Sequence, residues 1–156
     1  MKFQPVIKWS GSKRALSEQI ISYFPKEINT YYEPFCGGCS VLFQLLYSNI
    51  KVNNYICSDI NKDLIEIFNN IKENPNKLYE EYLKRWTRLN QLEDIEKRKK
   101  YYYSIRNRYN IEHDINDFMF LSRTSANGLI RYNSKGEFNA PFHFSRKGIN
   151  PEKLKE

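Results

Sequence analysis

The strongest limit on the fold of this chain comes from residues 31–61, where a glycine pair separates a strand from a helix. The sequence YYEPFCGGCSVLF (31–43) predicts the end of a short strand at 31–33, a sharp turn at Gly37 and Gly38, and a buried helix over 41–47. YICSDIN (55–61) predicts a second strand over 55–58. Glycines let a ligand approach the backbone, and the N-terminus of the following helix attracts anionic groups. The pattern predicts an α/β nucleotide-binding unit.

Asp59 follows the second predicted strand, about 20 residues after Gly38. An acid at this place accepts hydrogen bonds from both ribose hydroxyls of a bound nucleotide. A helix cap explains the residue equally well, because a helix is predicted to begin just after it. The spacing alone leaves both interpretations open.

The remaining segments predict helices and one hairpin. Residues 2–9 are predicted to be extended, and Pro25 ends a helix predicted over 13–24. Apolar spacing predicts further helices over 64–71, 78–89 and 118–123. Two strands, 129–133 and 137–139, are predicted around Gly136, which supplies the positive φ of a short loop. We therefore expect a nucleotide-binding part over 1–75 and a helical and hairpin part over 76–156.

Composition suggests a globular protein with an anionic partner. The 156 residues carry a net charge of +7, which makes a polyanion a plausible partner, although the charge also serves solubility. Its most basic stretch, EKRKKYYYSIRNRY (96–109), taken by itself favours a solvated helix with a tyrosine core stripe over a site for a polyanion. Three cysteines suggest a reducing cytoplasm; Cys36 and Cys39 have no second pair, so no metal site is predicted. No apolar run reaches the roughly 20 residues of a membrane span.

The ligand of the glycine turn is predicted from its charge. The chain lacks the G-x-G-x-x-G loop of dinucleotide sites and the G-K-[ST] loop of P-loop proteins. Glu33 lies beside the turn, where it would repel a phosphate and attract an ammonium group. S-adenosylmethionine carries an ammonium, a sulfonium and a ribose but no phosphate, so Glu33 and Asp59 suit it better.

Four motifs, IKWSGSKR (7–14), EPFCGG (33–38), SDIN (58–61) and NGLIRYNSKGEFNAPF (127–142), occur in this order. The chain thereby resembles the Dam-type (D12 class) adenine-N6 DNA methyltransferases from about residue 5 to 150. The resemblance implies part of a Rossmann-like S-adenosylmethionine-dependent methyltransferase fold, with a helical and β-hairpin subdomain that recognises double-stranded DNA. It also implies a cytoplasmic protein encoded by a bacterium or a phage, as in a restriction-modification system.

The resemblance assigns the cofactor-binding residues. Trp9 matches a position that packs on the cofactor, and Lys13 one that meets its carboxylate. Phe35 and Gly37 match the F-x-G turn, and Asp59 the ribose-binding acid. Trp9 as a core aromatic and Lys13 as a surface lysine are the competing interpretations. Cys39 stands where many members have another glycine.

The resemblance also assigns DNA-binding residues. Lys8 matches a lysine that faces DNA, and Arg131 is placed against a guanine in the major groove, a readout worth about 1–3 kcal/mol. Leu129 and Pro141 would contact a thymine methyl, and Asn127 would hold the gap left by an extruded base. Plain turns and surface positions are the alternative. The basic stretch at 97–108 would meet phosphates. Position 126 holds Ala instead of the stacking aromatic of some relatives.

The family's catalytic tetrapeptide, [DNS]-P-P-[YFW], does not occur in the sequence. It orients the adenine amino group, and in this family it follows the recognition hairpin. No catalytic residue is therefore assigned, and we expect the N-terminal part of a methyltransferase, whose complementary C-terminal half carries the motif. Two alternatives remain: a catalytically inactive module that binds DNA and cofactor, or a non-functional remnant.

Overall fold

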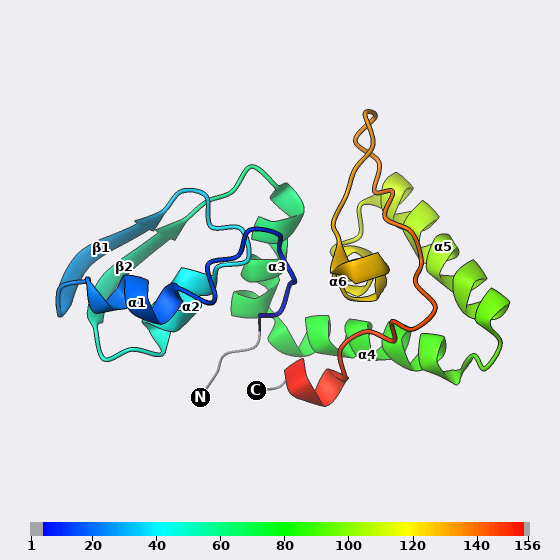
Figure 1. The fold of residues 1–156 in the computed structure, drawn as a ribbon, viewed down its shortest axis with the longest axis horizontal. Helices are drawn as coiled ribbons and strands as arrows, with labels where there is room; N and C mark the ends of the chain where they lie inside the picture. The colour runs from blue at the N-terminus through cyan, green and yellow to red at the C-terminus, as the bar shows by residue number, and fades with distance from the viewer. Residues whose placement is uncertain (1–4, 155–156) are drawn as a thin grey trace. The chain divides into compact units, whose positions relative to one another are not determined.

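A computed structural model describes residues 5–154, which form two compact units, Met1–Ile65 and Glu66–Glu156 (Figure 1). Each unit is described by itself. Residues 2–4 of the predicted extended segment lie outside the described residues. The helices and the parallel strands give the mixed α/β class that the sequence predicts.

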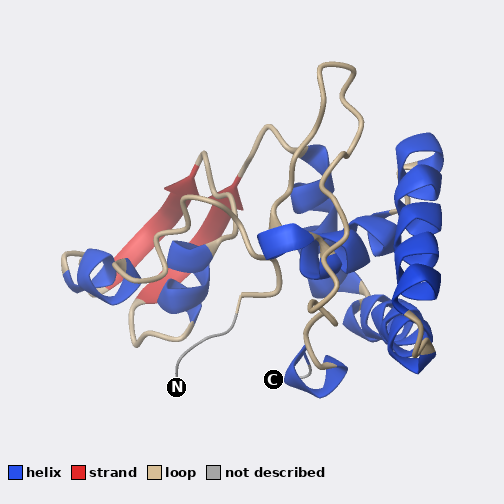
Figure 2. Ribbon diagram, turned by 45° about the vertical axis from the view of Figure 1, so that its right-hand side comes forward, coloured by secondary structure: helices blue, strands red, loops and turns tan. Residues whose placement is uncertain are grey.

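The first unit is built on two parallel strands, β1 (Glu27–Glu33) and β2 (Lys51–Cys57), paired in one register from Glu27 with Lys51 to Glu33 with Cys57. Parallel neighbours need a crossover, and α2 (Ser40–Leu46) supplies it (Figure 2). Ile21 of α1 (Ser17–Ser22), Tyr31 of β1 and Leu45 of α2 form the buried centre of this unit. The carboxyl ends of both strands therefore lead into the glycine turn and Asp59.

Several boundaries differ from the predictions. The helix predicted over 13–24 is confined to α1, and Leu16, counted in its apolar stripe, is 51% exposed. β2 begins at Lys51 rather than at 55, because pairing with β1 extends it across Asn53 and Asn54, a residue type disfavoured in strands. α2 was predicted to be buried, but Leu46 and Tyr47 are exposed at its end.

The helix α3 (Lys62–Glu73) contains the boundary between the units. Asn61 caps its first turn, because the Asn61 Oδ1 accepts a hydrogen bond from the Leu64 N–H at 3.1 Å. Leu64 and Ile67 are fully buried, as the apolar stripe over 64–71 predicts.

The second unit contains α4 (Pro75–Gln91), α5 (Ile95–Glu112) and α6 (Ile115–Thr124), then the short 3-10 helices η1 (Ala126–Gly128) and η2 (Pro151–Leu154). Asp94 caps α5 and Asp114 caps α6, each through its carboxylate and a first-turn N–H. The tyrosine stripe predicted for the basic helix is confirmed. The fully buried aromatic side chains of this unit are Tyr82, Tyr102, Tyr109, Phe118, Phe120 and Phe138.

A buried carboxylate joins the three long helices of this unit. Asp117 of α6 is 0% exposed and accepts hydrogen bonds from the Arg85 Nε of α4 at 2.7 Å and from two nitrogens of Arg108 of α5 at 2.6 Å each. Glu81 and Asp114 also bind Arg85. Two guanidinium groups on one buried carboxylate satisfy the charge that burial would otherwise penalise.

Residues 127–141, all described, form a hairpin-shaped segment, named the hairpin segment below; it begins in η1 and continues as loop (Figure 2, tan). The two strands predicted at 129–133 and 137–139 are reduced to a single antiparallel bridge between Tyr132 and Phe138. A second bridge, Ser125 with Phe142, closes the base. Gly136 has a φ of 79°, as its predicted loop position requires. The outer edge of the returning arm, residues 137–142, is bonded to side chains of α5.

Candidate functional site

The glycine turn of the first unit holds the indole of Trp9 against its backbone. Gly37 has a φ of 49°, and a Cβ added there would lie 2.8 Å from the Trp9 Cδ1 and 3.0 Å from its Nε1. A Cβ on Gly38 would lie 3.1 Å from the Trp9 Cβ. The structure thus brings Trp9 and Gly37 together: the indole ring lies close to the turn because glycine has no side chain there. Trp9 keeps part of its surface exposed.

Asp59 ties the same turn to the end of β2. Its Oδ2 accepts a hydrogen bond from the Gly37 N–H at 2.9 Å, and its Oδ1 accepts one from the Asn61 N–H at 2.9 Å. Asn61, rather than Asp59, bonds the first turn of α3. The helix-cap interpretation therefore falls on Asn61. Each Asp59 oxygen retains acceptor capacity, because an ionised carboxylate offers about four lone-pair sites.

Glu33 ends β1 and turns its carboxylate toward the start of α2. Its Oε2 accepts hydrogen bonds from the Tyr31 hydroxyl at 2.8 Å and from the Leu42 N–H at 3.1 Å. Burial raises the pKa of Glu33, and these two hydrogen bonds partly offset that rise. A bound cation would favour the ionised form, because an opposite charge nearby lowers the pKa of a carboxyl.

The other predicted residues of this unit lie on its surface. Phe35 is 89% exposed, directly before the turn. Lys8 and Lys13 are exposed on the chain that precedes α1. The sequence analysis predicts that these three residues contact ligands. Their side chains are accessible, but they do not take part in the contact between Gly37 and Asp59.

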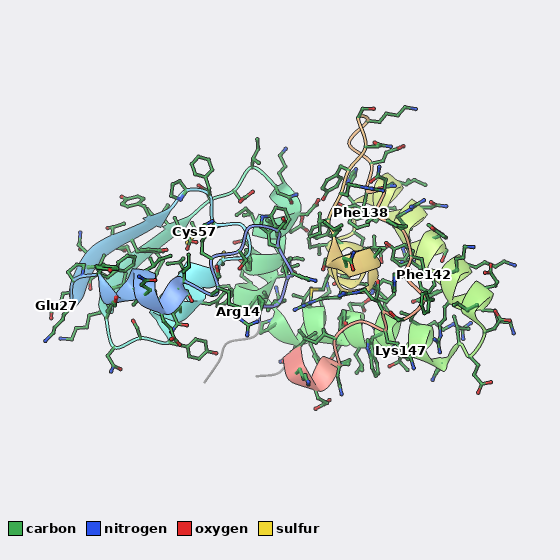
Figure 3. The ribbon with its side chains drawn as sticks, in the orientation of Figure 1. Arg14, Glu27, Cys57, Phe138, Phe142 and Lys147 are labelled. Carbon is green, nitrogen blue, oxygen red and sulfur yellow. The ribbon has the colours of Figure 1, made fainter. Side chains whose placement is uncertain are left out.

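The thiols of Cys36, Cys39 and Cys57 lie near the turn. Burial is the largest cause of a raised pKa at each, and it raises the pKa of Cys57 to about 12. Buried, protonated thiols are inert, which indicates a packing role. Figure 3 labels Cys57 at the end of β2. Among the described residues, no group of three or more His, Cys, Asp or Glu side chains could hold a metal ion.

The hairpin segment presents Arg131 in a fixed arrangement. The Arg131 Nε donates to the Asn139 Oδ1 at 2.8 Å, and one terminal nitrogen donates to the Asn139 main-chain oxygen at 3.2 Å. Asn133 closes the tip, since its Nδ2 donates to the Glu137 Oε2 at 2.7 Å. Arg131 is exposed beyond these contacts.

The other predicted DNA-facing residues lie on the same segment. Leu129 is 47% exposed, Asn127 has a φ of 55° and an exposed side chain, and Pro141 is exposed. The Ala126 N–H donates to the Pro141 main-chain oxygen at 2.9 Å, so the two arms meet near Asn127. The structure therefore brings Asn127 and Pro141 to the base of the segment, and Arg131 farther along it.

The basic stretch at 97–108 is divided by the structure. Lys97, Lys99 and Lys100 are exposed at the start of α5, whereas the Arg108 guanidinium binds the buried Asp117. Arg106 lies 4.5 Å from the Tyr103 ring centroid, with its guanidinium over the ring. Part of the stretch is thus committed to internal packing, which the sequence pattern did not separate.

Two asparagines of this region were missed by the sequence analysis. Asn139 holds Arg131, and Asn110 of α5 bonds both backbone groups of Phe138. Asn139 stands within the motif at residues 127–142, so the sequence offered a reason to consider it. Asn110 lies in a helix outside that motif, and the sequence offered no reason to consider it.

Comparison with known proteins assigns the family. A family profile, D12 class N6 adenine-specific DNA methyltransferase, matches residues 9–156. The type II methyltransferase M.MjaIII of Methanocaldococcus jannaschii is 38% identical over 154 residues, covering 91% of this chain and 53% of the relative. A DNA adenine methylase of Haemophilus influenzae is 35% identical, covering 97% and 51%. One from Escherichia coli K12 is 34% identical, covering 97% and 51%.

The chain belongs to the D12 class N6 adenine-specific DNA methyltransferase family. It spans about half the length of the curated relatives it matches. No helix within residues 5–154 is both long enough and apolar enough to cross a membrane.

Proposed function

We propose that this chain provides the cofactor-binding and target-recognition parts of an enzyme that methylates adenine N6 in DNA, with S-adenosylmethionine as the methyl donor. The proposal rests above all on the contact of Trp9, Gly37 and Asp59 where two parallel strands end, in a chain of this family. As the sequence predicts, residues 1–75 would bind the cofactor and residues 76–156 would recognise the DNA.

The residues of the glycine turn fit this cofactor. The turn carries no side chain at Gly37, so the indole of Trp9 lies against its backbone, and the exposed part of that ring can pack on a bound ligand. Asp59 has acceptor sites left for ribose hydroxyls, and Glu33 supplies a partly buried negative charge for the ammonium. Lys13 would meet the carboxylate, and Phe35 would pack on the ligand. The bound cofactor supplies a methyl group on a sulfonium.

The recognition part would bind double-stranded DNA through its hairpin segment. The Arg131 side chain, held along one edge by Asn139, keeps the donors at its tip for a guanine. Leu129 and Pro141 offer apolar surface for a thymine methyl, and Asn127 would fill the place of an extruded adenine. Lys8 and the exposed lysines of α5 would contact phosphates.

The catalytic tetrapeptide would come from a complementary segment outside these 156 residues. β1 and β2 would then be part of a larger Rossmann-like sheet, extended beside them. Because positioning the amino group dominates such a transfer, this chain alone should transfer little or no methyl.

The deciding experiment combines calorimetry of S-adenosylmethionine binding with transfer of labelled methyl to unmethylated DNA. Asp59→Asn should weaken cofactor binding at least about tenfold, the cost of about one charge-assisted hydrogen bond. Glu27→Ala, on the exposed end of β1, should leave binding unchanged. No cofactor binding by the folded wild type would refute the proposal. Transfer by the chain alone would refute the need for a complementary segment.

A further inference from the structure

We infer that Asn110 of α5 is a positioning residue that sets the readout of DNA by Arg131, although it is not placed at the DNA itself. The inference rests on the proposed role of Arg131. Asn110 is linked to Arg131 through two intervening residues: Asn110 bonds Phe138, Phe138 is followed by Asn139, and Asn139 bonds Arg131.

The first step is a double hydrogen bond between a side chain and a backbone. The Asn110 Oδ1 accepts from the Phe138 N–H at 2.8 Å, and the Asn110 Nδ2 donates to the Phe138 main-chain oxygen at 3.1 Å. A residue of a neighbouring strand would satisfy the same two groups in a ladder. Asn110 thus replaces a strand at this point, because its amide carries a donor and an acceptor on separate atoms.

The same face of α5 holds the next residues of the returning arm. The Tyr102 hydroxyl donates to the Ala140 main-chain oxygen at 2.9 Å, and Arg106 reaches the same oxygen at 3.4 Å. Tyr102, Arg106 and Asn110 are four residues apart, the spacing that places side chains on one helical face. Asn110 bonds the residue before Asn139 through two hydrogen bonds, whereas Tyr102 and Arg106 share the main-chain oxygen of the residue after it.

Ring contacts with the same helix also hold the arm. Phe138 and Phe142, both labelled in Figure 3, are on the returning arm. The Phe138 ring lies 5.9 Å from that of Tyr109, edge to face, and the Phe142 ring lies 5.6 Å from that of Tyr102. These contacts fix where the arm lies. The directional hydrogen bonds from α5 constrain its rotation about its own axis: Tyr102 holds one main-chain oxygen, and Asn110 holds both main-chain groups of Phe138.

That rotation controls Arg131. The Asn139 N–H donates to the Arg131 main-chain oxygen at 2.8 Å, while the Asn139 side-chain and main-chain oxygens accept from the Arg131 guanidinium. These bonds occupy one edge of the guanidinium and leave the donor pair at its tip. A guanine is read by such a pair in one plane, so tilting Asn139 misaligns the readout.

The test uses Asn110→Ala, Asn110→Asp and a matched control, Asn107→Ala. Asn107 is exposed on the same helix. Together with Asn110 and Phe138 it lines an open groove of about 440 Å³, but its amide is not bonded to Phe138. Hydrogen exchange first measures the Phe138 amide in each free protein. Exchange there should accelerate at least about tenfold in Asn110→Ala, because the acceptor is removed, and stay unchanged in the control.

The second readout is guanine preference. Selection from a randomised DNA duplex library, with wild type and Arg131→Ala, identifies the base pair whose guanine preference depends on Arg131. Binding is then compared between duplexes with and without that guanine. We expect a preference of about 5-fold to 150-fold in the wild type, lost in Arg131→Ala. Asn110→Ala should reduce it at least threefold, and affinity for the non-guanine duplex should change less than twofold. The control should match the wild type.

The outcomes separate the two levels of the argument. A preference lost in Arg131→Ala but retained in Asn110→Ala overturns the inference alone, even if Phe138 exchanges faster, because Asn110 would then be only structural. A wild type without any Arg131-dependent guanine preference overturns the proposed function, and the inference with it. Asn110→Asp covers the case in which the alanine variant does not fold. Its carboxylate keeps the acceptor for the Phe138 N–H but lacks the donor, so an intermediate preference is expected, and a preference equal to the wild type would overturn the inference.

Discussion

Replacing Gly37 by alanine should destabilise the first unit mainly through contact with Trp9. Two costs are expected. The left-handed φ of 49° costs an L-residue about 1–2 kcal/mol. A methyl group 2.8 Å from the Trp9 Cδ1 adds overpacking of about 1–3 kcal/mol. The free energy of unfolding of this unit should therefore fall by about 2–5 kcal/mol.

Gly11→Ala is the matched control. Gly11 also has a positive φ, 77°, but a Cβ there would have no heavy atom within 4 Å. It should carry the backbone cost alone, about 1–2 kcal/mol. The difference between the two variants isolates the contact with Trp9.

Hydrogen exchange of the β1–β2 amides measures the opening free energy of this unit in every variant. A double-mutant cycle then tests the cause. In a Trp9→Ala background, Gly37→Ala should cost no more than Gly11→Ala, which gives a coupling of about 1–3 kcal/mol. An unchanged cost of Gly37→Ala without the indole would refute the packing of Trp9 on the turn.

Three further results are expected. Asp117→Asn should lower the free energy of unfolding of the second unit by about 3–5 kcal/mol in urea denaturation, because two arginines lose their buried carboxylate; Lys84→Ala, which breaks an exposed pair, should cost less than about 1 kcal/mol. Burial raises the pKa of Glu33 and a cationic ligand needs its ionised form, so S-adenosylmethionine affinity measured by calorimetry should rise with pH through that raised pKa, and Glu33→Gln should flatten the rise. Lys97→Ala should reduce the salt slope of DNA binding by about 1, whereas Arg108→Ala, whose side chain binds Asp117, should mainly reduce stability.

The parts of the fold encoded in local patterns could be predicted from the sequence. The glycine pair gave the turn, and the apolar stripe with Leu64 and Ile67 gave α3. The first half of β2 could not be predicted, because Asn53 and Asn54 are paired with β1 against their own propensity. A tertiary interaction overrides the local preference at that point.

The candidate sites divide in the same way. Arg131 and Asp59 stand in short motifs that the resemblance to the family singles out, and their proposed roles stay predictions. Asp117 and Asn110 act through residues far along the chain, Arg85 and Phe138 respectively, and helical periodicity gives a polar residue in a helix no reason to be singled out. Only the three-dimensional contacts show that the helix stands in for a strand.

The bonds from α5 to the returning arm have a consequence for which substitutions this chain tolerates. Tyr102 and Asn110 bond main-chain atoms of Ala140 and Phe138, and main-chain atoms are the same whatever side chain a residue carries. Side chains on the exposed face of the hairpin segment can therefore be exchanged without losing these attachments. Under the proposed function, substitutions on that face would change the recognised DNA sequence and leave the attachment to α5 intact.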